Sequence, residues 1–140
     1  MVLHCACASL RRAARAVTHL YDEALRDSGL RATQFTLLQV LDRRGETRQD
    51  ELADFLAIDS TTLTRTLGPL SKQGLLRARP GTDRRERLWS ITPTGKRRLI
   101  RLTRVWESVQ ARLREQLGDV QWSRLLDDLA LMAGAAARVA

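Results

Sequence analysis

Residues 48–74 read RQDELADFLAIDSTTLTRTLGPLSKQG, and this stretch decides the fold. Apolar side chains recur at helical spacing over 48–56 and 60–73, which predicts two short helices joined by a turn at 57–59. The side chains expected to face inward are Leu52, Ala53, Phe55, Leu56, Leu63, Leu67 and Leu70. Gly74 favours the end of the second helix, because glycine readily adopts the left-handed conformation that terminates helices.

The pattern changes directly after this pair of helices. Residues 75–79 and 87–92 favour two strands, and residues 80–86 between them, PGTDRRE, are turn-forming and basic. Such an arrangement is typical of a winged helix-turn-helix, in which one helix enters the DNA major groove and the hairpin reaches the adjoining minor groove. The predicted fold class is therefore mainly α with a small β-hairpin wing.

Further helices are predicted on both sides of this unit. They cover residues 9–28, 33–45, 94–117 and 121–138. Hydroxyl side chains are expected to cap three of them: Ser9, Thr33 and either Thr92 or Thr94. Thr47 and Asp50 indicate a capping box at the start of the 48–56 helix. Glycines are expected to end the helices at Gly29, Gly45 and Gly118.

Length and composition favour one small intracellular domain. A chain of 140 residues, 44% of them apolar, is long enough for one core and too short for two well-separated domains. The sequence contains neither a run of roughly 18 apolar residues nor the pattern of an export signal. Cys5 and Cys7 lie too close together to provide a disulfide framework. We therefore expect a cytoplasmic protein without a membrane partner.

The basic charge is concentrated in the middle of the chain. The formal net charge of +8 fits a polyanionic partner, but its distribution is more informative. Residues 60–104 contain twelve basic side chains and two acidic ones, Asp83 and Glu86. This window coincides with the second short helix, the hairpin and the start of the long helix, where a nucleic-acid interface is expected.

The helix at 60–73 carries the side chains expected to contact DNA. Arg65 can bind guanine with two hydrogen bonds, and Lys72 is expected to contact phosphates. Short hydroxyls that can bond phosphates or base edges are Ser60, Thr61, Thr62 and Thr64. In the alternative interpretation, Ser60 is only an N-cap and the threonines form a solvated face.

The order of elements and several short motifs resemble the MarR family, the multiple-antibiotic-resistance type of regulator, over nearly the whole chain. The motifs are QDELA at 49–53, STTLTR at 60–65, LSKQGL at 70–75, DRR at 83–85 and ITPTG at 91–95. The resemblance implies a single domain over 1–140. Within it, residues 30–98 form the winged helix-turn-helix, and residues 9–28 and 100–140 form a helical dimerisation region.

The resemblance also implies a role for each residue of the wing motif. Arg85 is expected to enter the minor groove, Asp83 to position Arg85, and Arg84 to contact a phosphate. In the alternative interpretation these charges serve only solubility, because charged turns are usually solvated.

The terminal helices predict a homodimer, because two copies can bury the apolar surface that a monomer would expose. The resemblance implies the same assembly. Two recognition helices then lie about 34 Å apart, one turn of DNA, so the expected partner is double-stranded DNA with a short inverted repeat. Periodicity alone leaves a monomeric core as an alternative.

A small aromatic effector is a further implication of the resemblance, and the family usually acts by repression. The effector would bind in a crevice between the dimer helices and the winged unit, where Arg15, His19 and Trp106 are expected. Such an effector weakens DNA binding by its higher affinity for a conformation whose half-site spacing does not match the operator.

Cys5 and Cys7 leave three interpretations open, namely no regulatory role, thiol-based sensing and metal binding. His4 lies beside them, but the ligand set is incomplete and no metal site is predicted. The sequence contains no phosphate loop, nucleophile elbow or paired-histidine motif, so neither enzymatic activity nor a cofactor is expected. The rival function is a winged-helix protein-interaction module, against which the hydroxyl-rich helix and the basic wing both count.

Overall fold

The computed structural model describes residues 2–140. Its elements are α1 (Ala6–Leu25), the short 3-10 helix η1 (Arg26–Ser28), α2 (Ala32–Arg44), β1 (Thr47–Arg48), α3 (Gln49–Leu56), α4 (Ser60–Lys72), β2 (Leu76–Pro80), β3 (Arg87–Ile91), α5 (Pro93–Leu117) and α6 (Asp119–Val139). The chain divides into two compact units, one that ends at Trp106 and one that covers 107–140.

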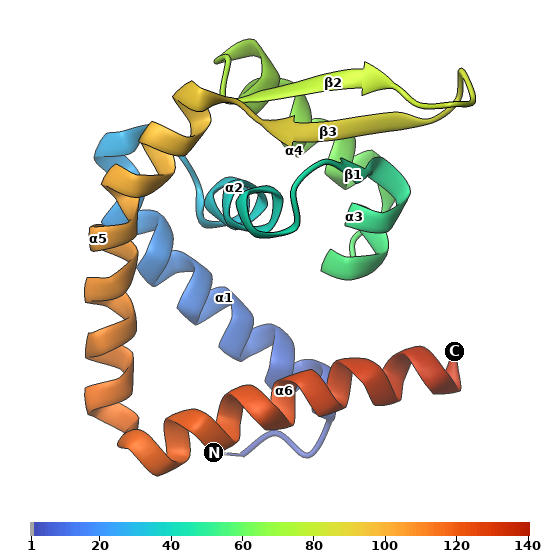
Figure 1. The fold of residues 1–140 in the computed structure, drawn as a ribbon. Coiled ribbons are helices and arrows are strands. Elements are labelled where there is room, and N and C mark those ends of the chain that lie inside the picture. The colour runs from blue at the N-terminus through green and yellow to red at the C-terminus, as the bar shows by residue number, and fades with distance from the viewer. Residues whose placement is uncertain (1) are drawn as a thin grey trace. The chain divides into compact units, whose positions relative to one another are not determined.

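The first unit is a winged helix-turn-helix. Helices α3 and α4 form its helix pair, and β2 and β3 extend beyond the helices as an antiparallel hairpin (Figure 1). We call this hairpin with its tip, residues 76–91, the wing. The predicted fold class is confirmed. The sequence does not predict β1, which pairs with β3 through Thr47 opposite Trp89 and completes a sheet of order β1-β3-β2.

Leucines supply most of the core of this unit. The fully buried ones on the helices are Leu25, Leu37, Leu38, Leu41, Leu52, Leu63, Leu67 and Leu70. Trp89 and Ile91 of β3 pack in the same cluster. The leucines predicted to face inward on α3 and α4 therefore do so, but Phe55 is 58% exposed. Its ring lies under the guanidinium of Arg44, 4.8 Å from the centroid, in a cation–π contact.

The predicted start of α1 is wrong by three residues. The helix begins at Ala6, with Cys5 in the N-cap position, so Ser9 lies inside the helix. The Ser9 hydroxyl donates to the carbonyl of Leu3 at 2.9 Å instead of capping the helix. It still satisfies a local backbone group, which is a common use of serine near helix ends.

The expected cap of α2 at Thr33 is also wrong, because a residue distant in the sequence takes its place. The helix begins at Ala32, whose backbone N–H donates to Oδ1 of Asp22 on α1 at 2.7 Å. The N–H of Arg31 donates to the side chain of Gln34 at 2.9 Å. A carboxylate ten residues away thus satisfies one of the unpaired N–H groups of a helix start.

No capping box forms between Thr47 and Asp50, since Thr47 belongs to β1. Thr47 is 4% exposed, and its hydroxyl donates to the carbonyl of Gly45 at 3.0 Å. Asp50 binds the guanidinium of Arg48 instead. The expected box therefore fails because its first residue is buried in a sheet.

The helix ends predicted at Gly45, Gly74 and Gly118 are confirmed, whereas α1 ends earlier, at Leu25, and Gly29 terminates the short helix η1. Each of these four glycines has a φ between 71° and 83°. Gly74 illustrates their use. After it, the N–H of Leu75 donates to the carbonyl of Leu70 at 3.0 Å, and the chain turns from α4 into β2.

Thr92 joins three elements of the first unit. Its hydroxyl accepts from the N–H of Gly95 at 3.0 Å, so Thr92, rather than Thr94, caps α5. The same hydroxyl donates to the carbonyl of Gly74 at 2.6 Å, and the N–H of Thr92 donates to the carbonyl of Leu75 at 3.0 Å. The end of α4, the sheet and the start of α5 therefore meet at this residue, and we call the set the Thr92 junction.

The second unit consists of the end of α5 and of α6. Helix α6 begins at Asp119, two residues before the predicted start, and Nε of Arg114 lies 2.6 Å from Oδ1 of Asp119. Between 40% and 73% of each of the following apolar side chains of α6 is exposed: Val120, Leu125, Leu126, Leu129, Leu131 and Met132. Within residues 2–140, no helix is both long and apolar enough to cross a bilayer.

Candidate nucleic-acid interface

Asp59 holds the first turn of α4. Its Oδ1 accepts from the backbone N–H of Thr62 at 2.8 Å, and its Oδ2 accepts from the Thr62 hydroxyl at 2.6 Å. These two hydrogen bonds lower the pKa of the Asp59 carboxyl. Ser60, the cap in the alternative interpretation of the sequence, is instead the first residue of the helix.

The hydroxyls at the start of α4 are not equivalent. Thr62 donates to Asp59, and Thr64 donates to the carbonyl of Ser60 at 2.8 Å. Within the described chain, the side chains of Ser60 and Thr61 make no hydrogen bond, and both residues are exposed. Ser60 and Thr61 therefore retain a free donor and free lone pairs, whereas the protons of Thr62 and Thr64 are already used.

Arg65 and Lys72 are exposed on α4, and neither forms an ion pair with a described residue. Arg65 lies one turn beyond Thr61 on the same face of the helix, because residues four apart are neighbours on a helix surface. The exposed surface of the first turns of α4 thus presents two free hydroxyls and an unneutralised guanidinium to solvent.

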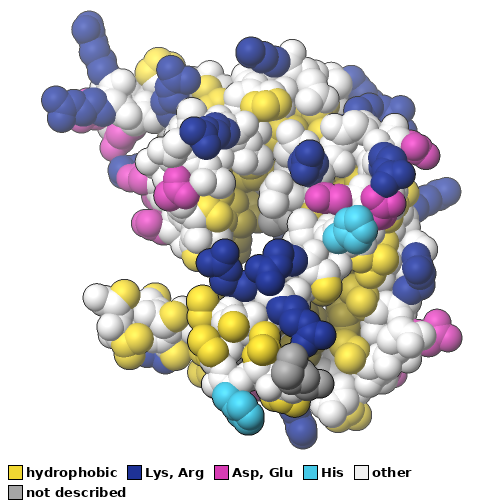
Figure 2. Space-filling view, turned by 180° about the vertical axis from the view of Figure 1, so that it is seen from behind, with side chains coloured by type: hydrophobic (Ala, Val, Ile, Leu, Met, Phe, Trp, Pro, Cys, Tyr) yellow, Lys and Arg dark blue, Asp and Glu magenta, His cyan; other side chains and the backbone are white. Residues whose placement is uncertain are grey.

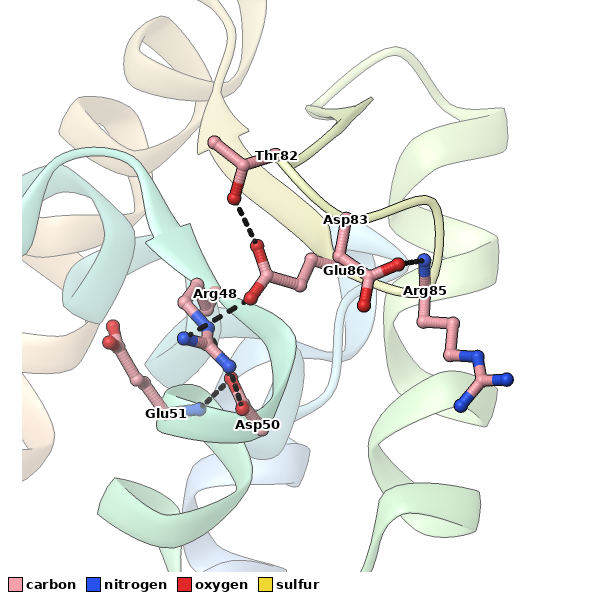
Figure 3. A network of polar contacts seen from close by, with 7 residues as sticks. All are labelled: Arg48, Asp50, Glu51, Thr82, Asp83, Arg85 and Glu86. Carbon is pink, nitrogen blue, oxygen red and sulfur yellow. Dashed lines mark hydrogen bonds and ion pairs between the residues drawn. The ribbon is translucent and has the colours of Figure 1, made fainter.

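The tip of the wing is a tight turn stabilised by its own backbone. The N–H of Gly81 donates to the carbonyl of Glu86 at 2.9 Å, and the N–H of Glu86 donates to the carbonyl of Asp83 at 2.9 Å. Oδ1 of Asp83 accepts from the backbone N–H of Arg85 at 3.1 Å. Asp83 therefore fixes the backbone of Arg85, while the Arg85 guanidinium points away from it (Figure 3).

Basic side chains project from the wing. Arg84 and Arg85 are exposed, and their guanidinium groups have no acidic partner within residues 2–140. Figure 2 views the molecule from behind, with the wing at the upper left, and shows Lys and Arg side chains projecting there beside a few acidic ones.

Two ion pairs attach the wing to residues 46–48, which connect α2 to α3 and include β1, and sequence reasoning missed both. Nη1 of Arg48 lies 3.4 Å from Oε1 of Glu86, and the Arg48 guanidinium also binds Asp50 (Figure 3). Close to the end of β2 that leads into the wing tip, Nε of Arg79 donates to Glu46 at 2.7 Å. These contacts lower the pKa values of Asp50 and Glu46 and raise those of Arg48 and Arg79. Their partners are distant in sequence, so no local pattern indicates them.

A groove of about 540 Å³ lies between α3, α4 and the wing. The residues that line it are Gln49, Asp50, Ala53, Ser60, Thr64, Gly68, Arg85, Arg87 and Trp89. The structure therefore brings the start of α4 and the predicted groove-inserting Arg85 to one cavity, from positions about 25 residues apart in the sequence.

Of the residues expected at an effector site, His19 lines a described pocket. This pocket has a volume of about 400 Å³ and is also lined by Asp22, Glu23, Arg26, Gly29, Leu30 and Arg31. Neither Arg15 nor Trp106 lines it. Trp106 packs instead on Phe35, with ring centroids 6.3 Å apart.

Cys5 and Cys7 are both free and exposed at the start of α1. Among the described residues, no group of three or more His, Cys, Asp or Glu side chains is placed to hold a metal ion. The two thiols are accessible to solvent: Cys5 is the N-cap residue of α1, and Cys7 lies in the first turn of that helix.

Comparison with known proteins identifies similar chains. The family model described as the MarR family matches residues 30–86. The uncharacterised HTH-type transcriptional regulator YwoH of Bacillus subtilis is 31% identical over 83 residues, which cover 59% of this chain and 61% of that relative. The match to this curated relative therefore spans about three fifths of its length.

Two solved structures extend the likeness to most of the chain. The Mycobacterium tuberculosis transcriptional regulator MosR, solved in complex with DNA, is 37% identical with a TM-score of 0.87, over 97% of this chain and 98% of that one. BpsR of Bordetella bronchiseptica, described as regulated in DNA binding by 6-hydroxynicotinic acid, is 25% identical with a TM-score of 0.80, over 89% and 95% of the two chains.

Proposed function

Since the chain belongs to the MarR family, we propose that it is a transcriptional regulator that binds double-stranded DNA as a homodimer. The observation that carries this proposal is the shared groove of α3, α4 and the wing, which is lined both by the free hydroxyl of Ser60 on α4 and by the unpaired Arg85. A helix and a basic hairpin placed in this way can occupy adjacent grooves of a duplex.

We assign separate roles to the helix and the wing. Helix α4 enters the major groove, where Ser60, Thr61 and Arg65 contact base edges or phosphates. Lys72 and Arg84 contact phosphates, and these contacts strengthen binding to DNA of any base sequence. Arg85 enters the minor groove, and Asp83 supports it by holding its backbone.

Two copies of the chain are proposed to recognise a short inverted repeat. Exposed apolar side chains along α6, among them Leu126 and Leu129, support a partner helix from a second copy. The regions 9–28 and 100–140 form the dimerisation region in this proposal, and residues 30–98 form the DNA-binding region of a single MarR-like domain. A two-fold dimer places its recognition helices about one DNA turn, about 34 Å, apart.

The regulator is proposed to act as a cytoplasmic repressor that a small aromatic molecule releases from DNA. The regulation of DNA binding by 6-hydroxynicotinic acid in BpsR, a protein of the same fold, supports an effector of this chemical class. Arg15, His19 and Trp106 are the residues assigned to the effector site, with its remaining walls supplied by the dimer. A regulator of this kind needs no catalytic activity and no cofactor, and none is proposed.

A thiol-responsive regulator on the same scaffold is the second candidate. The exposure of both Cys5 and Cys7 favours it, because solvent-accessible thiols are the ones that oxidants reach. DNA release by hydrogen peroxide that disappears in Cys5→Ser/Cys7→Ser supports this candidate. Unchanged release in that variant assigns the response elsewhere.

The proposed function is tested by binding to duplexes selected from a random library with the wild-type chain. Arg65→Ala should weaken binding and relax the preference at one or two base pairs, since a bidentate contact to guanine is worth about 1–3 kcal/mol. Lys72→Ala is the matched control on the same helix. It should weaken selected and scrambled duplexes alike and reduce the salt slope by about one.

Failure to enrich any sequence, combined with no DNA binding at low salt, would instead favour the protein-interaction module. Equal loss on selected and scrambled duplexes for Arg65→Ala would remove Arg65 from the base-reading role.

A further inference from the structure

We propose that Gln49 is a positioning residue that sets the recognition helix α4 against the wing, and that Thr64 cannot act as a hydrogen-bond donor to DNA. This inference rests on the proposed function and deepens it. It identifies which side chain determines the geometry of the interface, and which chemical groups of the bases α4 is able to read.

Gln49 connects three elements through its side-chain amide. It is the first residue of α3, and its Oε1 accepts from Nε1 of Trp89 on β3 at 2.9 Å. Its Nε2 donates to Oγ1 of Thr64 on α4 at 3.0 Å. Trp89 is 5% exposed, so its indole N–H has little access to water and depends on this partner.

The donor and acceptor of each hydrogen bond in this series, from Trp89 through Gln49 to Thr64, follow from the chemistry of the side chains. An indole N–H can only donate, so the carbonyl end of the Gln49 amide must face Trp89 and the NH₂ end must face Thr64. The oxygen of Thr64 therefore accepts, and its own proton is directed to the carbonyl of Ser60 at 2.8 Å. We call the sequence from Trp89 through Gln49 and Thr64 to Ser60 the Gln49 relay.

The Gln49 relay restricts what Thr64 can contact. Its proton is used and one lone pair is occupied, which leaves a single acceptor site. Phosphate oxygens and the O6 and N7 atoms of guanine all require a donor, so Thr64 cannot bond them. It can accept only from the amino groups of adenine or cytosine. The donors on the exposed surface of the first turns of α4 are Ser60, Thr61 and Arg65.

The same relay sets the spacing between helix and wing. Gln49, Thr64 and Trp89 all line the groove of about 540 Å³ that Arg85 also lines. Loss of the relay allows the start of α4 to shift relative to β3, which misaligns base contacts that need accurate geometry. Contacts from long, flexible Arg and Lys side chains to phosphates tolerate such a shift, so selectivity should fall more than affinity for random DNA.

The first test uses isosteric substitutions and two DNA probes. The probes are a duplex selected by the wild-type chain from a random library and a scrambled duplex of equal composition. Gln49→Met and Thr64→Val should each weaken the selected duplex about five- to tenfold and change the scrambled duplex less than about twofold. The double variant should be no weaker than the single ones, because both break the same relay.

Two further variants separate positioning from stability. Gln39→Met is the matched control, because Gln39 is a half-buried glutamine of α2 whose side chain makes no hydrogen bond within the described chain, and it should leave both affinities unchanged. Gln49→Glu still accepts from Trp89 but cannot donate to Thr64. This variant should keep the fold and lose selectivity. Its negative charge repels both duplexes equally, so the ratio of the affinities for the selected and the scrambled duplex is free of that effect.

A spectroscopic measurement reports the relay directly. The indole N–H cross-peak of Trp89 in a ¹H–¹⁵N spectrum, assigned with Trp89→Phe, should move in Gln49→Met and stay in place in Gln39→Met. Wild-type protein that binds no duplex overturns the proposed function itself. Wild-type protein that binds selectively, while Gln49→Met and Gln49→Glu keep its selectivity within about twofold, overturns only this inference. A loss in Thr64→Val without one in Gln49→Met also overturns it.

Discussion

Asp59 performs the capping that the alternative interpretation of the sequence assigns to its neighbour Ser60. A carboxylate cap satisfies the backbone of Thr62 and also occupies the Thr62 hydroxyl. As a result, the first residue of α4 keeps its own hydroxyl for an external partner. Because the N-cap is Asp59 and not Ser60, the hydroxyl of Ser60 is available to DNA and that of Thr62 is not.

We expect the stability that Asp59 contributes to decline in acid. Its folded-state pKa is lowered, first by the Thr62 hydroxyl and then by the Thr62 backbone N–H. A group with a lowered folded-state pKa stabilises the fold above its unfolded pKa and loses that contribution as pH falls through the folded-state value. Asp59→Ala should therefore lower the melting temperature by a few degrees near pH 7, and by less below about pH 4.

Circular dichroism melts of both proteins between about pH 3 and pH 7 measure this difference. Asp59→Asn serves as the control, because asparagine also caps helices but does not titrate. Its advantage over Asp59→Ala should not depend on pH. A difference between wild type and Asp59→Ala that is constant down to the acid end would contradict the assignment.

Asp83 should support Arg85 through the backbone and not through charge. Its carboxylate binds the N–H of Arg85, a contact that an asparagine oxygen reproduces. Asp83→Asn should therefore bind a selected duplex as well as wild type or better, since it also removes a negative charge from the interface. Asp83→Ala should bind about fivefold more weakly, the value of about one hydrogen bond. Equal loss in both variants, measured by fluorescence anisotropy, would indicate an ion pair to the guanidinium.

At the scale of elements, the Thr92 junction depends on a glycine. A Cβ at Gly95 would lie 2.2 Å from the carbonyl oxygen of Leu75 and 2.8 Å from Cγ1 of Ile91. Gly95→Ala should destabilise the protein by about 1–3 kcal/mol, because the nearest atom belongs to the backbone and cannot rotate away. Gly68→Ala, inside α4, meets nothing within 4 Å and should stabilise by about 0.5–1 kcal/mol.

Urea denaturation of the two glycine variants measures both values. Equal stability of Gly95→Ala and wild type would show that α5 can move away from the sheet without cost.

Most elements follow from local signals in the sequence. Leucine spacing predicts α3 and α4, and glycines with positive φ end α2, α4 and α5 where expected. Two of the failed predictions have a common cause. The strand β1 has two residues and forms only because β3 pairs with it, and α2 is capped by Asp22 from another helix. Contacts between residues that are distant in the sequence produce no periodic pattern from which they could be predicted.

The candidate site also has features that local sequence predicts and features that depend on the fold. Sequence reasoning identifies the face of α4 and the wing motif, because residue types and local spacing carry that information. It cannot tell that the proton of Thr64 is used inside the protein, nor that Glu46 neutralises Arg79, 33 residues away. The free cations and hydroxyls of an interface are known only once the internal pairs are known.

At the scale of the whole molecule, the proposed homodimer predicts a defined response to a charge on α6. Leu126, 49% exposed, lies on the same face as Leu129. Leu126→Asp should therefore convert the dimer to a monomer, since burying an unpaired carboxylate in an apolar interface is costly. Leu131→Asp is the matched control, because Leu131 points from the opposite side of α6.

Sedimentation gives the mass of each variant, and binding to full and half operators gives the consequence. The monomer should lose most of its affinity for the inverted repeat and retain its weak affinity for a half-site. Monomeric wild-type protein at micromolar concentration would contradict the proposed assembly.

The Thr92 junction holds the N-terminal end of α5 close to the end of α4, so α5 can tilt about that point. With 25 residues, α5 is about 37 Å long, so a tilt of about 5° displaces its far end by about 3 Å. At this end of α5, Thr92 donates hydrogen bonds to the carbonyls of Gly74 and Leu75, which follow α4 in the sequence. In the proposed regulator, a displacement of several ångströms at the far end of α5 corresponds to a small rotation at the Thr92 junction. We therefore expect an effector to change the angle at which α4 meets DNA more than its distance from DNA.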